Sequence, residues 1–184
     1  LEELENVDAV VVPIGGGGLI SGVAFAIKTL RPNVKVYGVQ AEGAASMFKS
    51  VKDGKPQTLS AVSTFADGIA VKAPGENTFH YCSEYVDEIV TVNEDEISTA
   101  ILTMMEQQKT IAEGAGAVSV AAVLANKLPL KGKNVVCVVS GGNIDVTILS
   151  RVITRGLLMS GRCCQLLIEL QDKPGQLREV TGVI

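Results

Sequence analysis

The sequence contains no tryptophan, and aromatic residues make up only 4% of its 184 positions. The core must therefore be aliphatic, and the many runs of valine, isoleucine, leucine and alanine suit a parallel sheet that is buried on both faces. Basic residues are not in excess, since the formal net charge is −4. This charge argues against nucleic acid or an anionic membrane as the partner and favours a small molecule.

Metal-ligating residues and long apolar runs are also scarce. The chain has one histidine and four cysteines, and no two cysteines have C-x-x-C spacing, so a zinc site is not expected. Cys163 and Cys164 are adjacent in an apolar run, which predicts buried structural thiols. No apolar run has the length of a membrane span, and none resembles a signal peptide. We therefore expect a reduced, cytoplasmic protein with no membrane partner.

Strand-like and helical patterns alternate along most of the chain. Runs rich in valine and isoleucine predict strands at residues 9–14, 35–40, 88–92 and 134–139. Helical patterns lie between and after them, at residues 19–30, 43–51, 94–108, 116–126 and 145–158. This alternation predicts an α/β fold with an open, mostly parallel sheet flanked by helices. In such folds ligands bind at the carboxyl ends of the strands.

Four consecutive glycines, Gly15, Gly16, Gly17 and Gly18, separate the first predicted strand from the helical segment 19–30. Without Cβ atoms, their backbone can adopt conformations that are barred to other residues and can turn several N–H groups toward one anion. The helix that follows adds unpaired N–H groups and the positive end of its dipole. The sequence therefore predicts a site for the phosphate of a cofactor.

Three known phosphate-binding devices use glycines in this setting. A P-loop is disfavoured, because Val23 stands where its lysine belongs. The spacing Gly16-x-Gly18-x-x-Ser21 approaches the dinucleotide-binding fingerprint, and Glu42 follows the second predicted strand, where an acid could hold a ribose. A dinucleotide site is therefore an alternative.

The third device is the glycine loop of pyridoxal-phosphate enzymes of the tryptophan-synthase β-type fold, which residues 15–19 closely resemble. Ser140-Gly141-Gly142-Asn143 directly follows the predicted strand 134–139, so we expect it at the same edge of the sheet as the glycine loop. In that family the corresponding serine hydrogen-bonds the pyridine nitrogen of the cofactor, a contact that a dinucleotide site does not need. The cofactor implied by this resemblance is pyridoxal 5'-phosphate.

The resemblance extends over almost all of residues 8–158. Segments similar to threonine dehydratases, also called threonine ammonia-lyases, lie at residues 35–40, 66–69, 92–97 and 113–117. Serine racemases share much of this pattern more loosely. The tail from residue 162 to residue 184, with an expected strand at residues 163–170 and the turn Asp172-Lys173-Pro174-Gly175, resembles the first strand and helix of an ACT regulatory domain.

The family resemblance implies an ammonia-lyase that deaminates L-threonine and L-serine by β-elimination, giving 2-ketobutyrate or pyruvate and ammonia. Such enzymes serve isoleucine biosynthesis or threonine catabolism. The residues implied to hold the cofactor phosphate are Gly15, Gly16, Gly17, Gly18 and Leu19. Ser140 is implied to contact the pyridine nitrogen.

Two further residues have a functional and a structural interpretation. Glu113 matches an acid that the family places near the cofactor ring, but it can equally be an acidic cap of the next helix. Asn143 can orient Ser140 or contact the ring hydroxyl of the cofactor. Alternatively, Asn143 with Asp145 is an ordinary helix start.

The expected domain organisation follows from the same resemblance. Residues 1–158 are the C-terminal portion of the catalytic domain, residues 159–162 a linker, and residues 163–184 the truncated beginning of an ACT domain. The chain starts without methionine, which is typical of a fragment. The Schiff-base lysine of the family lies upstream of its glycine loop in a Ser-Phe-Lys context, which this sequence lacks. The fragment is therefore expected to be inactive alone. The family also implies a homo-oligomer, dimer or tetramer, and an amino-acid or nucleotide effector.

Serine racemases bind a divalent cation through two acids and a carbonyl group. Gln40 and Ser46 fall at the two acid positions here, so no metal is expected at that place. His80 and Lys109 are expected at the surface without a catalytic role. Two alternative functions stay open: a serine racemase or dehydratase, and a noncatalytic module that binds a nucleotide or an effector.

Overall fold

Strand β1 (Ala9–Pro13) lies inside a four-stranded sheet, and all of its residues are buried. The computed structural model describes residues 3–183. The strand order is β3-β2-β1-β4, and each pair of neighbouring strands is parallel. The other strands are β2 (Lys35–Ala41), β3 (Glu88–Val92) and β4 (Val135–Cys137). Each falls on a run that the sequence predicts as a strand.

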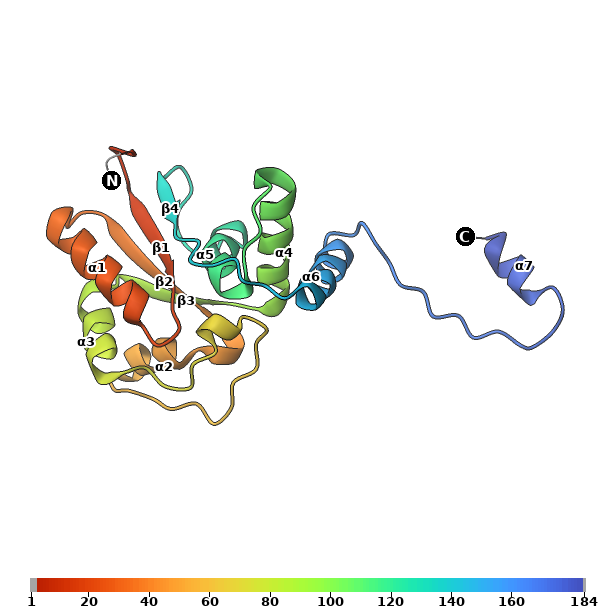
Figure 1. The fold of residues 1–184 in the computed structure, drawn as a ribbon, viewed down its shortest axis with the longest axis horizontal. Helices are drawn as coiled ribbons and strands as arrows, with labels where there is room; N and C mark the ends of the chain where they lie inside the picture. Colours follow the sequence, from red (N-terminus) through yellow and green to blue (C-terminus); the bar gives the residue numbers. More distant parts are fainter. Residues whose placement is uncertain (1–2, 184) are drawn as a thin grey trace.

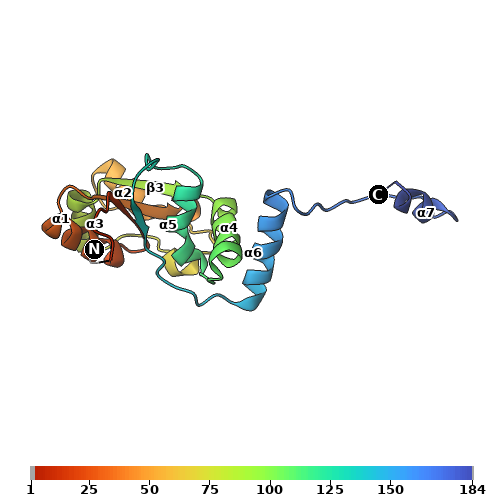
Figure 2. The same ribbon diagram turned by 90° about the horizontal axis from the view of Figure 1, so that it is seen from above.

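Helices cover both faces of the sheet (Figures 1 and 2). One face carries α1 (Gly18–Leu30), α2 (Ser46–Asp53) and α3 (Glu76–Tyr85). The other face carries α4 (Glu94–Thr103) and α5 (Gly114–Leu124), and α6 (Val146–Met159) packs against α4. Short helical turns complete the body at Glu42–Ala44, Asp67–Ile69 and Met104–Gln108. The arrangement confirms the predicted α/β class with a parallel sheet flanked by helices.

The side chains of β1 alternate between two cores. Ala9 and Val11 belong to the core beneath α4 and α5, whereas Val10 and Val12 belong to the core beneath α1 and α3. Successive side chains of a strand point to opposite faces, so a strand covered on both faces buries the side chains at all of its positions and favours apolar residues there. This preference explains why the run contains no polar residue.

The strand order changes direction at β1. The chain runs from β1 through β2 to β3 on one side of the sheet and later places β4 on the other side of β1. The loop after β1 leads to α1 on one face, while the segment after β4 leads to α6 on the opposite face. In open parallel sheets, this divergence of loops at the carboxyl ends creates the crevice in which ligands bind.

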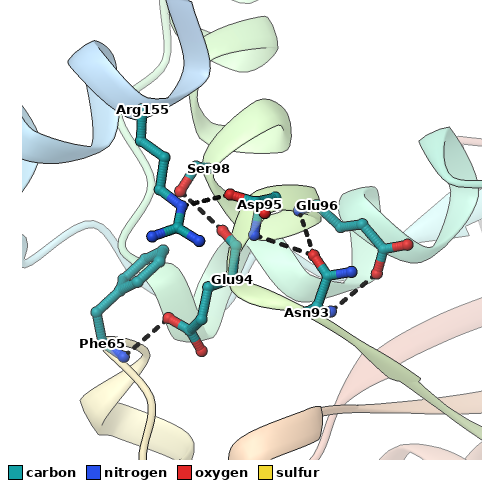
Figure 3. Close-up of polar contacts among 7 residues, drawn as sticks. All are labelled: Phe65, Asn93, Glu94, Asp95, Glu96, Ser98 and Arg155. Carbon is teal, nitrogen blue, oxygen red and sulfur yellow. Dashed lines mark hydrogen bonds and ion pairs between the residues drawn. The ribbon is translucent and has the colours of Figure 1, made fainter. Parts of the chain in front are cut away.

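A capping box begins α4 (Figure 3). The Asn93 side chain accepts hydrogen bonds from the amides of Asp95 and Glu96, both at 3.0 Å, and the Glu96 carboxylate accepts one from the Asn93 amide at 2.8 Å. The neighbouring Glu94 carboxylate accepts a hydrogen bond from the Phe65 amide at 3.1 Å. The first turn of α4 thereby holds the loop that leads to the Asp67–Ile69 turn.

The C-terminal tail extends away from this body and ends in α7 (Gln176–Thr181) (Figure 1). The strand expected at residues 163–170 is wrong, because this segment is irregular. The expectation of buried thiols is also wrong: Cys163 and Cys164 are exposed. A strand needs a neighbour to pair with its backbone groups, and none lies beside this segment in the described part of the chain. Within residues 3–183, no helix combines the length and apolar character needed to cross a membrane.

Candidate cofactor site

The glycine loop and the serine motif lie at the same edge of the sheet. Val11 of β1 pairs with Cys137 of β4, and the Val138 amide donates a hydrogen bond to the Val11 carbonyl oxygen at 2.9 Å. Gly15 and Ser140 follow these paired residues within a few positions, at the carboxyl ends of adjacent strands. Adjacent strands are about 4.8 Å apart. Both predicted motifs therefore begin at the crevice where the strand order reverses.

The glycine loop leaves a row of backbone donors without partners. The Ile14 amide is still bonded to the Val39 carbonyl oxygen in the sheet, at 2.8 Å, and the Ser21 amide is bonded within the start of α1. Between them, the amides from Gly15 to Ile20 donate no hydrogen bond to any group in residues 3–183. Consecutive unpaired amides at a helix start are the arrangement that binds an anion.

Gly17 and Gly18 have different surroundings. Gly17 precedes α1 with φ +95°, and a Cβ atom there would meet Met47 Cε at 2.6 Å and Thr78 Cβ at 2.8 Å. At Gly18, by contrast, a Cβ atom would meet nothing within 4 Å. The inner side of the loop is thus closely packed, whereas the helix start at Gly18 is open and exposed. The residues present fit the phosphate group of pyridoxal 5'-phosphate, because the loop offers unpaired amide donors and the helix start at Gly18 leaves space for the anion.

The loop packs against the turn at Asp67–Ile69. A Cβ atom on Gly15 would lie 3.2 Å from Ile69 Cα and 3.4 Å from the Gly68 carbonyl oxygen. Gly68 in turn is closely packed, because a Cβ atom there would lie 3.0 Å from Ala115 Cβ. This turn therefore fills the space between the glycine loop and the start of α5.

Glu113 lies against the serine motif. Its amide donates a hydrogen bond to the Gly141 carbonyl oxygen at 3.1 Å, and its carboxylate oxygen lies where a Cβ atom of Gly141 would stand. The same oxygen is 3.5 Å from the position of a Cβ atom on Gly68. Glu113 is the residue before α5, but its side chain makes no capping hydrogen bond. The acid therefore stands at the start of the helix, as the structural interpretation expects, but without a capping hydrogen bond, and its carboxylate lies beside Gly141 at the crevice.

Asn143 shares an open pocket with Glu113. The pocket has a volume of about 390 Å³ and is also lined by Phe65, Asp67 and Ile148. The helix cap of α6 is Asp145, whose side chain accepts a hydrogen bond from the Thr147 amide at 2.7 Å, so Asn143 does not cap this helix. The exposed Ser140 lies three positions before Asn143 in the chain. Neither Ser140 nor the glycine loop is among the residues that line this pocket.

Three residues that the sequence analysis considers do not line this pocket. His80 is exposed and forms an i,i+4 pair with Glu84, with His80 Nε2 and Glu84 Oε2 3.4 Å apart. Lys109 is also exposed, and its ammonium group donates to the Glu106 carbonyl oxygen at 2.6 Å. Glu42, the acid of the dinucleotide alternative, is exposed in the turn after β2.

Gln40 and Ser46 are both buried, but they do not form a metal site of acidic groups. The Gln40 side chain accepts a hydrogen bond from the Phe48 amide at 2.8 Å and donates one to the Ile14 carbonyl oxygen at 3.4 Å. The Ser46 hydroxyl has no hydrogen-bond partner in the described part of the chain. Within the described residues, no group of three or more histidine, cysteine or acidic side chains is placed to hold a metal ion.

Sequence reasoning missed two residues that shape this site. Phe65 lines the pocket beside Glu113, and Thr78 contacts the glycine loop. Phe65 lies directly before Ala66-Asp67-Gly68-Ile69, a segment that the family resemblance does single out, so that resemblance offered a signal for Phe65. Thr78 stands in an ordinary helical pattern with no such signal.

Comparison with known proteins defines the class. Residues 1–141 match the family model described as pyridoxal-phosphate dependent enzyme, and the chain belongs to this family. The match includes both the glycine loop and Ser140. It confirms the predicted cofactor, pyridoxal 5'-phosphate, and favours it over the dinucleotide alternative.

Individual relatives are more specific. The chain is 54% identical over 184 residues to an L-threonine ammonia-lyase from Thermotoga maritima, covering 100% of this chain and 46% of that protein. Among solved structures, it is similar to the processed form of threonine deaminase isoform 2 from Solanum lycopersicum, with a TM-score of 0.79 and 42% identity over 84% of this chain and 46% of the other. Serine racemase from Dictyostelium discoideum has a TM-score of 0.73 and 37% identity, covering 79% of this chain and 47% of the other. The chain thus spans about half the length of the curated relatives it matches.

Proposed function

We propose that the polypeptide containing this chain is a pyridoxal-phosphate-dependent threonine ammonia-lyase. It deaminates L-threonine, and L-serine, by β-elimination to 2-ketobutyrate or pyruvate and ammonia. The single observation that carries this proposal is the row of unpartnered amides from Gly15 to Ile20, which lies at the same sheet edge as Ser140. The L-threonine ammonia-lyase relative at 54% identity supports the choice of substrate.

In this proposal the glycine loop holds the cofactor through its phosphate. The amides of Gly15, Gly16, Gly17, Gly18 and Leu19 donate to the phosphate oxygens, and the positive end of the α1 dipole adds to the attraction. Bound pyridoxal phosphate supplies an electron sink that stabilises negative charge at the substrate Cα. No metal ion is needed for these contacts.

Ser140 sets the electronic character of the site. Its hydroxyl is neutral and can donate one hydrogen bond to a ring nitrogen without adding a negative charge. A carboxylate at that place would instead favour a protonated ring nitrogen. A neutral partner makes the ring a weaker sink, which favours loss of a β-hydroxyl group over reprotonation at Cα.

Glu113 and Asn143 complete the wall beside the ring. The Glu113 carboxylate lies next to Gly141, and Asn143 lines the same pocket. We propose that Glu113 holds or moves a proton near the reacting atoms and that Asn143 donates to an oxygen of the cofactor. We assign the Schiff-base role to no lysine of this chain and propose that the catalytic lysine lies in another part of a longer polypeptide.

A product assay tests the proposal. The 184-residue chain and the natural polypeptide that contains it are each incubated with pyridoxal phosphate and L-threonine or L-serine, and keto acids are identified by mass spectrometry. We expect 2-ketobutyrate from the natural polypeptide and none from the chain alone. Keto acid from the chain alone would refute the assignment of the lysine, and its absence from both would refute the ammonia-lyase.

A serine racemase is the second candidate, supported by the structural similarity to the Dictyostelium discoideum protein. The same assay separates the two activities when the serine that remains is analysed on a chiral column. D-serine as the main product would favour the racemase. Pyruvate with unchanged L-serine chirality would favour the ammonia-lyase.

The tail completes the proposal. We propose that residues 163–184 begin an ACT regulatory domain, which in a longer polypeptide would respond to an amino-acid or nucleotide effector within a homo-oligomer. The exposed apolar side chains of this segment support the idea of a missing partner, because large apolar groups are normally covered. They are Leu166, Leu167, Ile168, Leu170, Leu177 and Val183.

A further inference from the structure

The side chain of Thr78, on α3, contacts the glycine loop. Its hydroxyl lies 2.6 Å from the Gly16 carbonyl oxygen, across 62 positions of sequence. The Gly75 carbonyl oxygen is also within reach, at 3.0 Å. A threonine hydroxyl has one proton and can donate fully to one acceptor at a time. The shorter distance assigns that proton to Gly16.

This hydrogen bond fixes the orientation of one peptide group. In a planar trans peptide, the carbonyl oxygen and the amide hydrogen point in opposite directions. Because the Gly16 carbonyl points toward Thr78, the Gly17 N–H of the same peptide points away from α3. That N–H belongs to the row of amides with no partner in the described residues.

Glycine makes such an anchor necessary. Residues without a Cβ atom populate positive and negative φ about equally, so a peptide between two glycines can rotate at little cost. After such a rotation the Gly16 carbonyl oxygen, rather than the Gly17 N–H, would face the bound anion. A carbonyl oxygen repels phosphate, so the loop must be held in one of the two orientations.

A second contact ties the same residue to α1. The Ser21 hydroxyl, in the first turns of α1, donates to the Thr78 carbonyl oxygen at 3.4 Å and lies 3.9 Å from Cys82 Sγ. Thr78 therefore contacts the loop through its side chain and the start of α1 through its backbone. The glycine loop and the start of α1, which together form the anion site, are therefore both contacted by Thr78.

We propose that Thr78 is a positioning residue for the phosphate cradle: its hydroxyl holds the Gly16–Gly17 peptide so that the Gly17 N–H faces a phosphate monoester. This inference rests on the proposed function of the glycine loop. It assigns to α3 a part in cofactor binding through the loop, without contact between Thr78 and the cofactor.

The test uses pyridoxine 5'-phosphate as the probe, because it carries the phosphate but no aldehyde to react with surface lysines. It is titrated into the ¹⁵N-labelled chain, and unphosphorylated pyridoxine is titrated in parallel. Four proteins are compared: the natural sequence, Thr78→Val, Thr78→Ser and Thr29→Val. Thr29 is a matched control, because it is exposed on α1 and, among residues 3–183, its hydroxyl bonds only to the Phe25 carbonyl oxygen, at 2.7 Å.

We expect the phosphate ester, but not pyridoxine, to shift the amide signals of Gly15 to Leu19 in the natural sequence. Thr78→Val removes the hydroxyl at nearly constant shape, so affinity falls about three- to tenfold, as expected for one hydrogen bond, and the Gly17 shift is lost. Thr78→Ser keeps the hydroxyl, so its affinity and its Gly17 shift should match those of the natural sequence. Thr29→Val behaves like the natural sequence.

The outcomes distinguish failure of the proposed role of Thr78 from failure of the proposed phosphate site. If the natural sequence shows no loop shifts, the phosphate cradle itself is refuted and the role of Thr78 with it. If the cradle binds but Thr78→Val binds equally well, only the role of Thr78 is refuted. If Thr78→Ser is as weak as Thr78→Val, packing and not the hydroxyl is responsible, which also refutes it. Should Thr78→Val not fold, Thr78→Ala replaces it in the same comparison with Thr78→Ser.

Discussion

The Glu113 amide donates a hydrogen bond to the Gly141 carbonyl oxygen at 3.1 Å, while the Glu113 carboxylate occupies the space beside the Cα atom of Gly141. Two segments that are far apart in the sequence, the start of α5 and the loop after β4, are thereby joined at the crevice. The absence of a side chain at residue 141 is what allows the carboxylate to lie there.

Alanine substitutions at two neighbouring glycines should differ in their effects. In Gly141→Ala the new methyl group meets the mobile end of Glu113, which can swing away, so we expect a loss of at most about 1 kcal/mol. In Gly116→Ala it meets the Gly141 backbone oxygen at 2.6 Å, which cannot yield, so we expect a loss of about 1–3 kcal/mol. Denaturant unfolding measures both. Equal losses would contradict the packing described here.

Activity should depend on the position of the Glu113 carboxylate. Displacing the carboxylate in Gly141→Ala should lower kcat of the natural polypeptide about as much as Glu113→Gln does, because both remove the charge from the crevice. The measurement is kcat with L-threonine for both variants. Full activity of Gly141→Ala would show that the position of Glu113 is unimportant.

The glycine loop offers a second pair of substitutions. Gly17→Ala places a side chain at φ +95° against Met47 and Thr78, which should cost about 2 kcal/mol or more. Gly22→Ala lies in the middle of α1, where a Cβ atom meets nothing within 4 Å, and should stabilise the chain by about 0.5–1 kcal/mol. Thermal unfolding of both variants checks the opposite signs.

Asp87 provides a prediction about acid stability. Burial tends to raise its pKa, but hydrogen bonds from Lys28, Lys35 and the Val36 amide outweigh burial and lower the pKa below its ordinary value. Their atoms lie 2.6, 2.7 and 2.8 Å from the carboxylate. The folded chain thus binds this proton more weakly than the unfolded chain does. The resulting stability is present above the ordinary pKa of about 4 and is lost as pH falls through the lower folded value.

Asp87→Asn should therefore destabilise the chain at pH 7 by about 1–3 kcal/mol, the range for hydrogen bonds to a charged group. The difference from the natural sequence should shrink as pH falls below about 4. Urea unfolding between pH 7 and pH 2 measures it. A difference that stays constant over this range would show that the charge of Asp87 contributes nothing.

The four cysteines should divide into two classes. Burial raises the pKa of Cys82 and of Cys137 to about 11, so few of these thiols are ionised at pH 8, and the thiolate is the reactive form. Cys163 and Cys164 are exposed. We expect these two to react rapidly with a thiol reagent in the native chain and the other two only after unfolding, as mapped by mass spectrometry. Rapid labelling of Cys82 would contradict its burial.

The sequence predicted the parts of the fold that depend on local patterns. Runs of valine and isoleucine mark the strands because both faces of a covered strand are buried, as Val11 and Val12 illustrate. The glycine loop and Ser140 could be brought to one edge because both directly follow parallel strands. The confirmed cofactor came from the family resemblance.

The remaining parts depend on contacts between distant segments. Nothing near Thr78 in the sequence indicates that it meets Gly16, because loop packing and not periodicity brings them together. Gly68 lies in the turn at Asp67–Ile69, and its local sequence does not indicate that a Cβ atom there would lie only 3.0 Å from Ala115 Cβ. The strand expected at residues 163–170 failed for a related reason, since a strand pattern cannot form a strand without a neighbour.

A crystal structure of the natural polypeptide with pyridoxal phosphate tests the central claim most directly. We predict phosphate oxygens within about 3 Å of the amide nitrogens of the loop from Gly15 to Leu19, and the pyridine nitrogen within about 3 Å of Ser140 Oγ. A phosphate bound away from these amides, or a ring nitrogen facing a carboxylate such as Glu113 in place of Ser140, would contradict the account.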